Sequence, residues 1–186
     1  YNPDMVELSK RNAQKAGVGG KAEFKRADLF ETDFSNATVV TMFLLPDINL
    51  RLRPKILDMK PGTRVVSNSF TMGDWKWDES ITAGSDEGCT SYCTAYLWIV
   101  PAKVAGTWKT PQGTLKLEQQ FQMVSGTLNT SGRELALTNP KLTGDRFEFT
   151  AGGVQYSGRV NGERIEGTMR AGSSASAWSA TRESRS

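Results

Sequence analysis

The sequence predicts an α/β domain over residues 1–102, joined to an all-β domain over residues 103–186. In the first part, apolar strand-like runs alternate with segments of helical periodicity, which favours a mostly parallel sheet flanked by helices. In the second part, short segments alternate between apolar and polar residues and end at turn sequences, which is typical of an antiparallel meander or small barrel. The formal charge changes at the same place, from −1 over residues 1–100 to +4 over residues 101–186.

The chain opens on a predicted helix over about residues 3–16. Pro3 suits the first helical turn, and Asn2 before it is a suitable N-cap residue. After this helix, the segment AEFKRAD over residues 22–28 alternates like a strand and ends at Asp28. We expect the polar side chain of Asp28 to lie at the edge of the sheet.

A central strand is predicted over residues 37–45, where ATVVTMFLL forms a continuous apolar run. Such a run is typical of a strand that is buried on both faces of a parallel sheet. The pattern that follows predicts a helix around residues 47–57 and further strands over residues 64–70 and 94–102. The intervening segment, about residues 72–91, is polar and rich in Gly, Asp and Glu.

Composition excludes several kinds of chemistry. The chain has no histidine, so an imidazole base, a Ser-His-Asp triad and a His-rich zinc site are excluded within this sequence. A net charge of +3 gives no reason to expect a nucleic-acid partner. No apolar run is long enough to span a membrane.

The two cysteines, Cys89 and Cys93, form a poor metal site because no other soft ligand lies near them in the sequence. We predict two free, partly buried thiols. The alternative is a local disulfide, which would indicate an oxidising compartment. The compartment itself stays open between a bacterial cytoplasm and a periplasm.

Tryptophans mark both parts of the chain. Trp75 and Trp77 in GDWKWDE are expected to pack between the two domains rather than to form an aromatic lid over a substrate. The acidic residues near them are predicted to be solvated loop charges: Asp74, Asp78 and Glu79.

In the second part, AGTWKT resembles the Gly-x-Trp opening of lipocalin-like meanders. We expect Trp108 to lie in the core and Arg182 to stack on it as a cation–π pair, across the first and last of about seven or eight strands. A small barrel is either filled by its own side chains or holds one small ligand, and the sequence leaves both open.

Four segments carry a resemblance to a known family: YNPDMVELSKRNAQKAGV, RADLFETD, ATVVTMFLLPDIN and LRPKILDMKPGTRVVSNSF. Together they resemble the class I, seven-stranded S-adenosylmethionine-dependent methyltransferases. The resemblance implies an incomplete, N-terminally truncated Rossmann-like domain with an extra C-terminal β domain. It also implies that the chain is a methyltransferase, or a remnant of one, acting on an unidentified small-molecule or protein acceptor.

The family's motifs map a cofactor site onto this sequence. One motif matches the loop that follows the ribose-binding acid, a second matches the acidic and apolar pair near the adenine, and a third matches the end of the strand that faces the methyl donor. The implied cofactor-binding residues are Tyr1, Asn2, Asp28, Leu29, Thr41, Met42 and Phe43. The glycine-rich turn and the ribose-binding acid of the family are absent from the sequence, and no metal is implied.

The segment LLPDINLRLRPKILDMKPGTRVVSNSF, residues 44–70, is similar to the lysine-methylating branch of this fold and its bacterial relatives. That similarity implies that Asn49, Ser67 and Asn68 hold the acceptor nitrogen near the donor methyl group. Methyl transfer from a sulfonium depends on alignment more than on acid–base chemistry, so the absence of histidine is no obstacle.

Three alternatives remain at this point. The missing strands belong to residues outside this sequence, or to another chain, or the scaffold has been repurposed. A repurposed scaffold would be a hydrolase using carboxylates such as Asp28 or Asp47, or a noncatalytic protein that binds a small ligand or partner. Without those strands, residues 37–45 would have an unpaired edge, which predicts a homo-oligomer.

Overall fold

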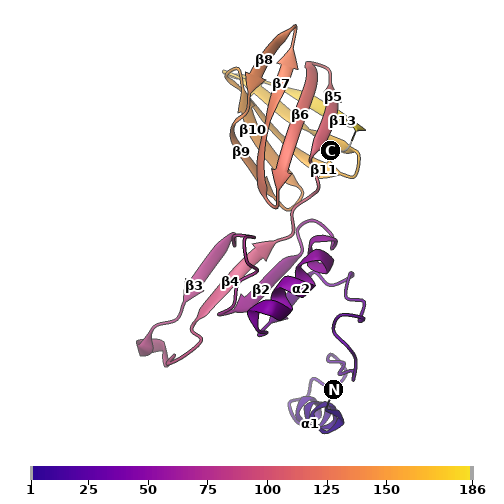
Figure 1. The fold of residues 1–186 in the computed structure, drawn as a ribbon, viewed down its shortest axis with the longest axis vertical. Coiled ribbons are helices and arrows are strands. Elements are labelled where there is room, and N and C mark those ends of the chain that lie inside the picture. The colour runs from indigo at the N-terminus through magenta and orange to yellow at the C-terminus, as the bar shows by residue number, and fades with distance from the viewer. Residues whose placement is uncertain (1, 185–186) are drawn as a thin grey trace. The chain divides into compact units, whose positions relative to one another are not determined.

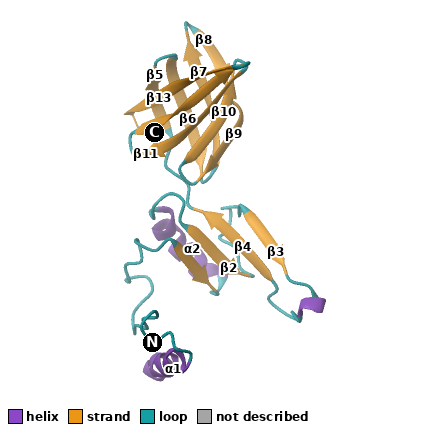
Figure 2. Ribbon diagram, turned by 180° about the vertical axis from the view of Figure 1, so that it is seen from behind, coloured by secondary structure: helices purple, strands orange, loops and turns teal. Residues whose placement is uncertain are grey.

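The computed structural model describes residues 2–184 and divides into two compact units, Tyr1–Phe34 and Ser35–Ser186 (Figure 1). Tyr1, a predicted cofactor residue, lies outside the described residues. The first unit holds one helix and loops. The second unit holds two β-sheets and the second α-helix (Figure 2).

The predicted N-terminal helix is confirmed as α1 (Pro3–Lys15). Asn2 caps it, because its Oδ1 accepts a hydrogen bond from the Asp4 N–H at 3.0 Å. The strand predicted over residues 22–28 is wrong, since these residues form an extended loop. A strand needs a hydrogen-bonded neighbour, and no strand in the described part of the chain pairs with this segment.

The first sheet of the second unit is mixed rather than mostly parallel. Its four strands lie in the order β1-β2-β4-β3, with bounds β1 (Val39–Met42), β2 (Arg64–Asn68), β3 (Glu79–Thr82) and β4 (Thr94–Ile99). Strands β1 and β2 are parallel and are joined by α2 (Pro46–Leu57), whereas β2–β4 and β3–β4 are antiparallel. The parallel crossover is therefore confirmed only for the β1–α2–β2 part.

Helix α2 packs on one face of this sheet. Its Leu52 and Ile56 are buried, as are Val65 of β2 and Trp98 of β4, which are paired in register. On the opposite face, Val39 of β1 is 42% exposed. The prediction that this strand is buried on both faces is therefore wrong in the described structure, because β1 is the terminal strand and the helix covers only one of its faces.

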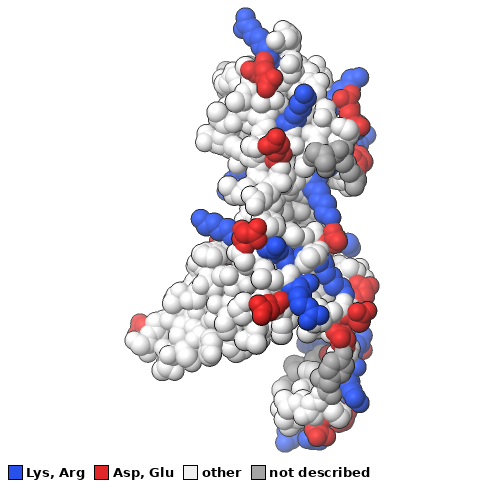
Figure 3. All heavy atoms as spheres, viewed as in Figure 1, with Lys and Arg blue, Asp and Glu red and all other residues white. Residues whose placement is uncertain are grey.

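Strand β3 lies in a segment for which the sequence predicted no strand. All four of its residues are exposed, and a short 3₁₀ helix (Ser85–Glu87) follows it before the chain returns in β4. Ile81 of β3 is 73% exposed. On the face drawn in Figure 3, the surface over β3 and β4 consists mostly of uncharged atoms.

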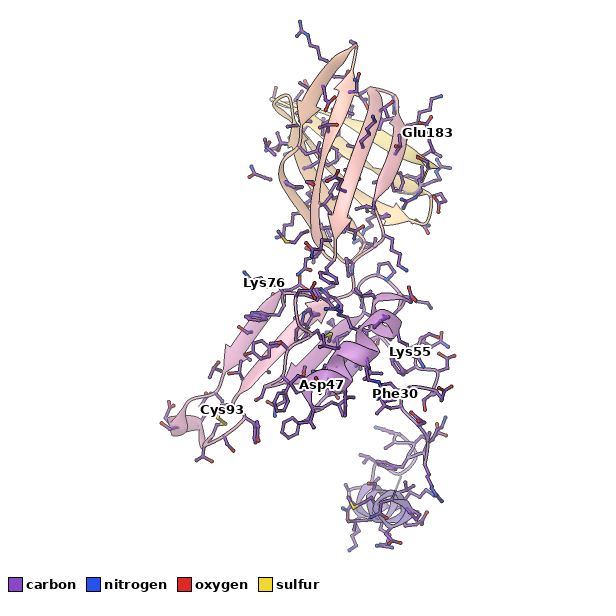
Figure 4. All side chains as sticks on the ribbon, viewed as in Figure 1. Phe30, Asp47, Lys55, Lys76, Cys93 and Glu183 are labelled. Atoms are coloured by element: carbon purple, nitrogen blue, oxygen red, sulfur yellow. A yellow bond between two sulfur atoms is a disulfide. The ribbon has the colours of Figure 1, made fainter. Side chains whose placement is uncertain are left out.

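Cys89 and Cys93 form a disulfide in the loop between the 3₁₀ helix and β4 (Figure 4). The prediction of two free thiols is therefore wrong. The four-residue spacing allows the bridge because the intervening chain turns back on itself, with Tyr92 in a left-handed backbone conformation at φ 56°. No group of three or more potential metal ligands is present among the described residues.

Asp78 is half-buried rather than solvated, which corrects the prediction made for it. Its Oδ2 accepts a hydrogen bond from the Ile99 N–H at 2.7 Å. Burial raises the pKa of Asp78, the Ile99 hydrogen bond opposes this shift, and the negative charge of Glu79 adds to it. Asp74 is exposed and pairs with Arg53, whose hydrogen bond lowers the pKa of the Asp74 carboxyl.

Asp78→Asn is expected to raise the melting temperature at pH 7 by a few degrees, because it keeps the acceptor for Ile99 and removes a partly desolvated charge. Because the pKa of Asp78 is raised in the folded state, its contribution to stability is largest at pH values below 3.8, the ordinary pKa of an Asp side chain. This contribution is lost as the pH rises through the folded-state pKa. Thermal unfolding of both proteins from pH 3 to pH 8 tests this. A difference that stayed constant across that range would contradict it.

The second sheet confirms the predicted antiparallel architecture, with nine strands instead of seven or eight. Its order is β8-β7-β6-β5-β13-β12-β11-β10-β9, and every pairing is antiparallel. The bounds are β5 (Gly106–Thr110), β6 (Gly113–Gln120), β7 (Met123–Thr130), β8 (Arg133–Ala136), β9 (Thr138–Thr143), β10 (Arg146–Ala151), β11 (Val154–Asn161), β12 (Arg164–Ala171) and β13 (Ser174–Ser184). The two end strands of this sheet, β8 and β9, follow one another in the chain, and the Leu137 N–H between them donates to the Gly126 carbonyl of β7 at 3.0 Å, so that the sheet forms a nearly closed barrel.

The predicted Trp108–Arg182 pair is confirmed. Trp108 is fully buried, and the Arg182 guanidinium lies 4.1 Å from its ring centroid. The same guanidinium donates to the carbonyls of Lys103 and Ala105 and forms an ion pair with Glu163 at 2.7 Å. Arg182 therefore connects β13 by hydrogen bonds to residues 103–105, which directly precede β5.

Arg182→Lys is expected to lower the free energy of unfolding by about 1–3 kcal/mol. A lysine ammonium group cannot replace the planar guanidinium group, which donates to two carbonyls and stacks on the Trp108 ring. The matched control is Arg164→Lys, whose exposed pair with Glu166 at 2.9 Å is expected to change stability by less than about 0.5 kcal/mol. Urea denaturation measures both. Equal small effects would contradict the role assigned to Arg182.

Candidate functional site

The candidate site lies at the carboxyl ends of β1 and β2, where helix α2 begins. Asn49 comes from the first turn of α2 and is fully buried, and Ser67 of β2 is also fully buried. Asn49 Nδ2 donates to Ser67 Oγ at 3.3 Å, and Ser67 Oγ donates to the Phe70 carbonyl at 2.7 Å. Two of the three predicted acceptor-side residues are therefore in contact.

The orientation of the Asn49 amide follows from its neighbours. Nδ2 also lies 3.3 Å from the Phe70 carbonyl and 3.2 Å from the Thr71 carbonyl. Carbonyl oxygens only accept hydrogen bonds, so a flipped amide would place oxygen against oxygen. The assigned orientation leaves Asn49 Oδ1 as a buried acceptor with no partner among the described residues. A buried acceptor without a partner is costly, and it is a position where a ligand donor is favoured.

Three aromatic rings form a cluster at the same edge. Phe43 follows β1, Phe70 follows β2, and Tyr92 comes from the disulfide loop. The ring centroids lie 6.0 Å apart for Phe43–Phe70, 5.3 Å for Phe43–Tyr92 and 5.9 Å for Phe70–Tyr92. Phe43 and Tyr92 are 57% and 58% exposed, so this cluster presents ring surface to solvent.

Two residues at this edge have a left-handed backbone without being glycine. Ser69, directly after β2, has φ 62°, and Tyr92 has φ 56°. Such conformations cost of order 1–3 kcal/mol for a residue with a side chain, and they concentrate at functional sites. The Ser69 N–H donates to the Thr94 carbonyl at 2.7 Å, which holds the turn before Phe70 in place.

The other predicted residues of the second unit lie around this edge in different environments. Asn68 is half-buried, and its Oδ1 lies 3.2 Å from Ser69 Oγ. Thr41 is exposed, whereas Met42 is only 8% exposed and packs in the core of the sheet. Of the three predicted residues at the end of β1, Phe43 therefore offers the largest exposed apolar surface.

The first unit contains Asn2, Asp28 and Leu29. Asn2 caps α1, and Asp28 forms a turn, because its Oδ1 accepts from the Phe30 N–H at 2.8 Å and its carbonyl accepts from the Thr32 N–H at 2.9 Å. Leu29 is 36% exposed. Asp28 therefore stabilises a local turn, and the apolar side chain that follows it reaches solvent.

Sequence reasoning missed two parts of the site. The carbonyls of Phe70 and Thr71 carry no side-chain signal, and Tyr92 lies between the polar segment predicted over about residues 72–91 and the strand predicted over residues 94–102, where no role was assigned to it. The signal that was available for Tyr92 is its place between Cys89 and Cys93. A bridge closing that loop would fix the backbone on both sides of the ring.

Of the carboxylates considered for a hydrolase, Asp28 lies in the first unit and Asp47 in the second. Asp47 is an exposed first-turn residue of α2 (Figure 4). No group of three or more His, Cys, Asp or Glu residues that could bind a metal occurs in residues 2–184. No helix among these residues is long and apolar enough to cross a membrane.

Residues 1–79 match the model of the family described as the ANTKMT methyltransferase domain. This range includes α1, the parallel β1–α2–β2 crossover and both Asn49 and Ser67. The resemblance to S-adenosylmethionine-dependent methyltransferases that the sequence predicted is thereby confirmed for this part of the chain.

Individual relatives are similar over the same region. A protein-lysine N-methyltransferase of Saccharolobus islandicus (strain REY15A) is 40% identical over 100 residues, which are 53% of this chain and 60% of that protein. A lysine N-methyltransferase of Mus musculus that is named for ATP synthase is 33% identical over 86 residues, 46% of this chain and 35% of that protein. The matched part of the chain thus spans between about a third and three fifths of these relatives.

The chain is also similar to a solved structure. That structure is of an RNA methyltransferase from Salinibacter ruber in complex with S-adenosyl-L-homocysteine, with 41% sequence identity and a TM-score of 0.49. The match covers 55% of this chain and 63% of that one.

Proposed function

We propose that this chain belongs to a methyltransferase that uses S-adenosylmethionine, and that the Asn49–Ser67 pair lies on the methyl-acceptor side of its site. The observation that carries the proposal is the buried Asn49 Oδ1, which has no partner among the described residues. It lies within the region that matches methyltransferases, at the carboxyl ends of two parallel strands, where ligands of open α/β sheets bind.

The acceptor we propose is an amine of the lysine type. Asn49 Oδ1 would accept one N–H of the neutral amine and leave the nitrogen lone pair free for attack. The cofactor supplies an electrophilic methyl group on a sulfonium. As the nitrogen–carbon bond forms, the sulfur–carbon bond breaks, and the amine then loses one proton to water.

The exposed rings of Phe43 and Tyr92, with the half-buried Phe70 beside them, support an acceptor that carries positive charge before or after transfer. A cation over an aromatic face gains about 0.5–2 kcal/mol, depending on its desolvation. The methyltransferases of S. islandicus and mouse described above are named for lysine, and the S. ruber protein is named an RNA methyltransferase. The buried amide oxygen favours an amine, which offers an N–H donor, whereas the three rings would suit a cationic amine or a nucleobase equally.

For the cofactor we propose the residues that the resemblance identified. These are Tyr1, Asn2, Asp28, Leu29, Thr41, Met42 and Phe43, with Asn68 beside the acceptor. Phe43 offers ring surface at the end of β1, and Asp28 offers a carboxylate next to the apolar Leu29. An adenine needs apolar surface and an acceptor for its amino group, which these residue types supply.

Pairing of two copies along β1 is also proposed, because β1 is the terminal strand of the four-stranded sheet in the described residues. Light scattering at increasing protein concentration tests it. A monomer throughout would contradict this proposal and leave the methyltransferase proposal unaffected.

The methyltransferase proposal is tested by isothermal titration with S-adenosylmethionine, followed by transfer of a labelled methyl group to a lysine-rich acceptor peptide. We expect a dissociation constant of about micromolar order and label retained on lysine after acid hydrolysis. No binding up to millimolar cofactor would favour a noncatalytic binding protein. Label on RNA but not on the peptide would contradict the amine acceptor.

A further inference from the structure

One end of the β-barrel contains a cavity of about 400 Å³. Four turns surround this end, those joining β5–β6, β7–β8, β10–β11 and β12–β13. The cavity is lined mainly by apolar side chains, including Leu128, Leu135, Val154, Tyr156 and Met169. None of its lining residues carries a charged side chain, and its volume falls within the range of small-molecule sites.

Gln112 supplies this apolar cavity with a polar group that could bind a ligand. Its Oε1 is buried and has no hydrogen-bond partner among the described residues. Its Nε2 donates only to Met169 Sδ, at 3.4 Å, and a thioether sulfur is a weak acceptor. Its backbone is fixed, because the Gln112 and Gly113 N–H groups both donate to Thr110 Oγ1 at 3.1 Å.

The side of the cavity formed by Tyr156 is rigid. The Tyr156 ring stacks on Phe149 at 4.7 Å and meets the edge of Trp178 at 5.3 Å. Burial raises the pKa of Tyr156, which indicates an environment of low polarity around this ring. A ligand would therefore enter a preformed apolar space and would not need to open the core.

We propose that this cavity binds a small, uncharged, lipophilic molecule that carries one hydrogen-bond donor, such as a medium-chain alcohol, with its donor bound to Gln112 Oε1. A charged ligand is disfavoured because the lining offers no counter-charge, and burying an unpaired charge is costly. A pure hydrocarbon would leave Gln112 Oε1 without a partner. This site is separate from the methyltransferase proposal and does not depend on it.

The test compares two isomers of equal size, 1-octanol, which has a donor, and heptyl methyl ether, which has none. Each is titrated into protein whose methionine methyl groups are ¹³C-labelled, and the Met169 methyl resonance reports binding in the cavity. We expect both isomers to shift this resonance, with 1-octanol binding about tenfold more tightly, as expected for one hydrogen bond to a buried acceptor.

Two variants separate the contributions. Gln112→Leu is expected to remove the tenfold preference and to retain binding of the ether. Leu135→Glu places a charge in the cavity from the short strand β8 and is expected to abolish binding of both isomers, with the melting temperature confirming that the barrel remains folded. No shift of the Met169 methyl with either isomer up to its solubility limit would overturn the proposal. So would an equal preference for the two isomers in the parent protein.

Discussion

Trp75→Ala is expected to lower the free energy of unfolding by about 3–5 kcal/mol, the range typical of a fully buried aromatic side chain replaced by alanine. Trp75 has no exposed surface. Its ring lies 6.2 Å from that of Trp98 in the four-stranded sheet and stacks on Phe121 of the β6–β7 turn at 5.8 Å. Its removal would open a cavity where the two sheets of the second unit meet.

Hydrogen bonds add to this effect. Trp75 Nε1 donates to Gln122 Oε1 at 3.0 Å, and Gln122 Nε2 donates to the Lys76 carbonyl at 2.7 Å. The Trp98 Nε1 donates to the Trp75 carbonyl at 2.8 Å. The alanine variant keeps the backbone acceptor but leaves the Gln122 carbonyl oxygen without its donor. We therefore expect the cost to lie toward the upper end of the range.

The matched control is Trp77→Ala, two residues away. Trp77 is half-buried and contacts Tyr96 at 4.7 Å, so its loss is expected to cost about 1–2 kcal/mol. Chemical denaturation followed separately in the barrel and in the four-stranded sheet measures both variants. A Trp75→Ala cost no greater than that of Trp77→Ala would show that Trp75 does not hold the two sheets together.

Asn49→Ala is expected to reduce methyl transfer by about 100-fold, because an acceptor amine without its hydrogen-bond partner is poorly aligned for attack. The same variant removes the Asn49 donor from the Thr71 carbonyl, whereas the Phe70 carbonyl keeps its hydrogen bond from Ser67 Oγ, and we expect this loss to cost about 1–3 kcal/mol of stability. Activity must therefore be measured well below the melting temperature of the variant. The ratio of kcat/KM values for parent and variant gives the effect.

Two controls distinguish alignment from general damage. Asn68→Ala removes the half-buried amide that we place beside the acceptor, and because its Oδ1 contacts Ser69 Oγ we expect it to lower kcat/KM by less than about tenfold, a smaller loss than in Asn49→Ala. Ser67→Ala removes one acceptor for Asn49 Nδ2 but leaves the two carbonyls, so we expect an intermediate loss. Unchanged cofactor binding in Asn49→Ala, measured by calorimetry, would show that the effect is on the acceptor. A kcat/KM within threefold of the parent would contradict the role of Asn49.

Local signals in the sequence predict some of these elements well. Proline at the first helical turn fixes the starts of α1 and α2, and the apolar alternation of the second part predicts antiparallel strands. The Trp108–Arg182 pair was also predictable, because first and last strands of a nearly closed barrel are neighbours. Each of these features is determined within a short stretch of chain or by simple topology.

Features that depend on distant partners were not predictable. Residues 22–28 have a strand-like pattern but no paired strand in the described structure, whereas β3 has no such pattern and is formed through its pairing with β4. The antiparallel direction of β4 depends on the disulfide loop that reverses the chain before it. Local residue patterns cannot report such long-range pairing.

The candidate site also has features that the sequence predicts and features that depend on distant partners. Asn49 and Ser67 were identified by resemblance to a family motif, but they lie 18 residues apart and their hydrogen bond required the structure. Asn49 Oδ1 has no partner among the described residues because two backbone carbonyls fix the orientation of the amide, and the sequence gives no sign of those carbonyls. Tyr92 lies between the bridged Cys89 and Cys93 in a left-handed backbone conformation, and its ring contacts Phe43, an arrangement that the sequence pattern did not predict.

The most direct test is to follow the side-chain amide resonances of the ¹⁵N-labelled protein while S-adenosylmethionine, and then a lysine analogue such as n-butylamine, are added at high pH. We predict that the cofactor shifts the backbone amides of Phe43 and Ser69, and that the amine then shifts the Asn49 NH₂ pair. Saturable cofactor binding whose shifts leave the Asn49–Ser67 edge unchanged would contradict the account, as would no cofactor binding at millimolar concentration.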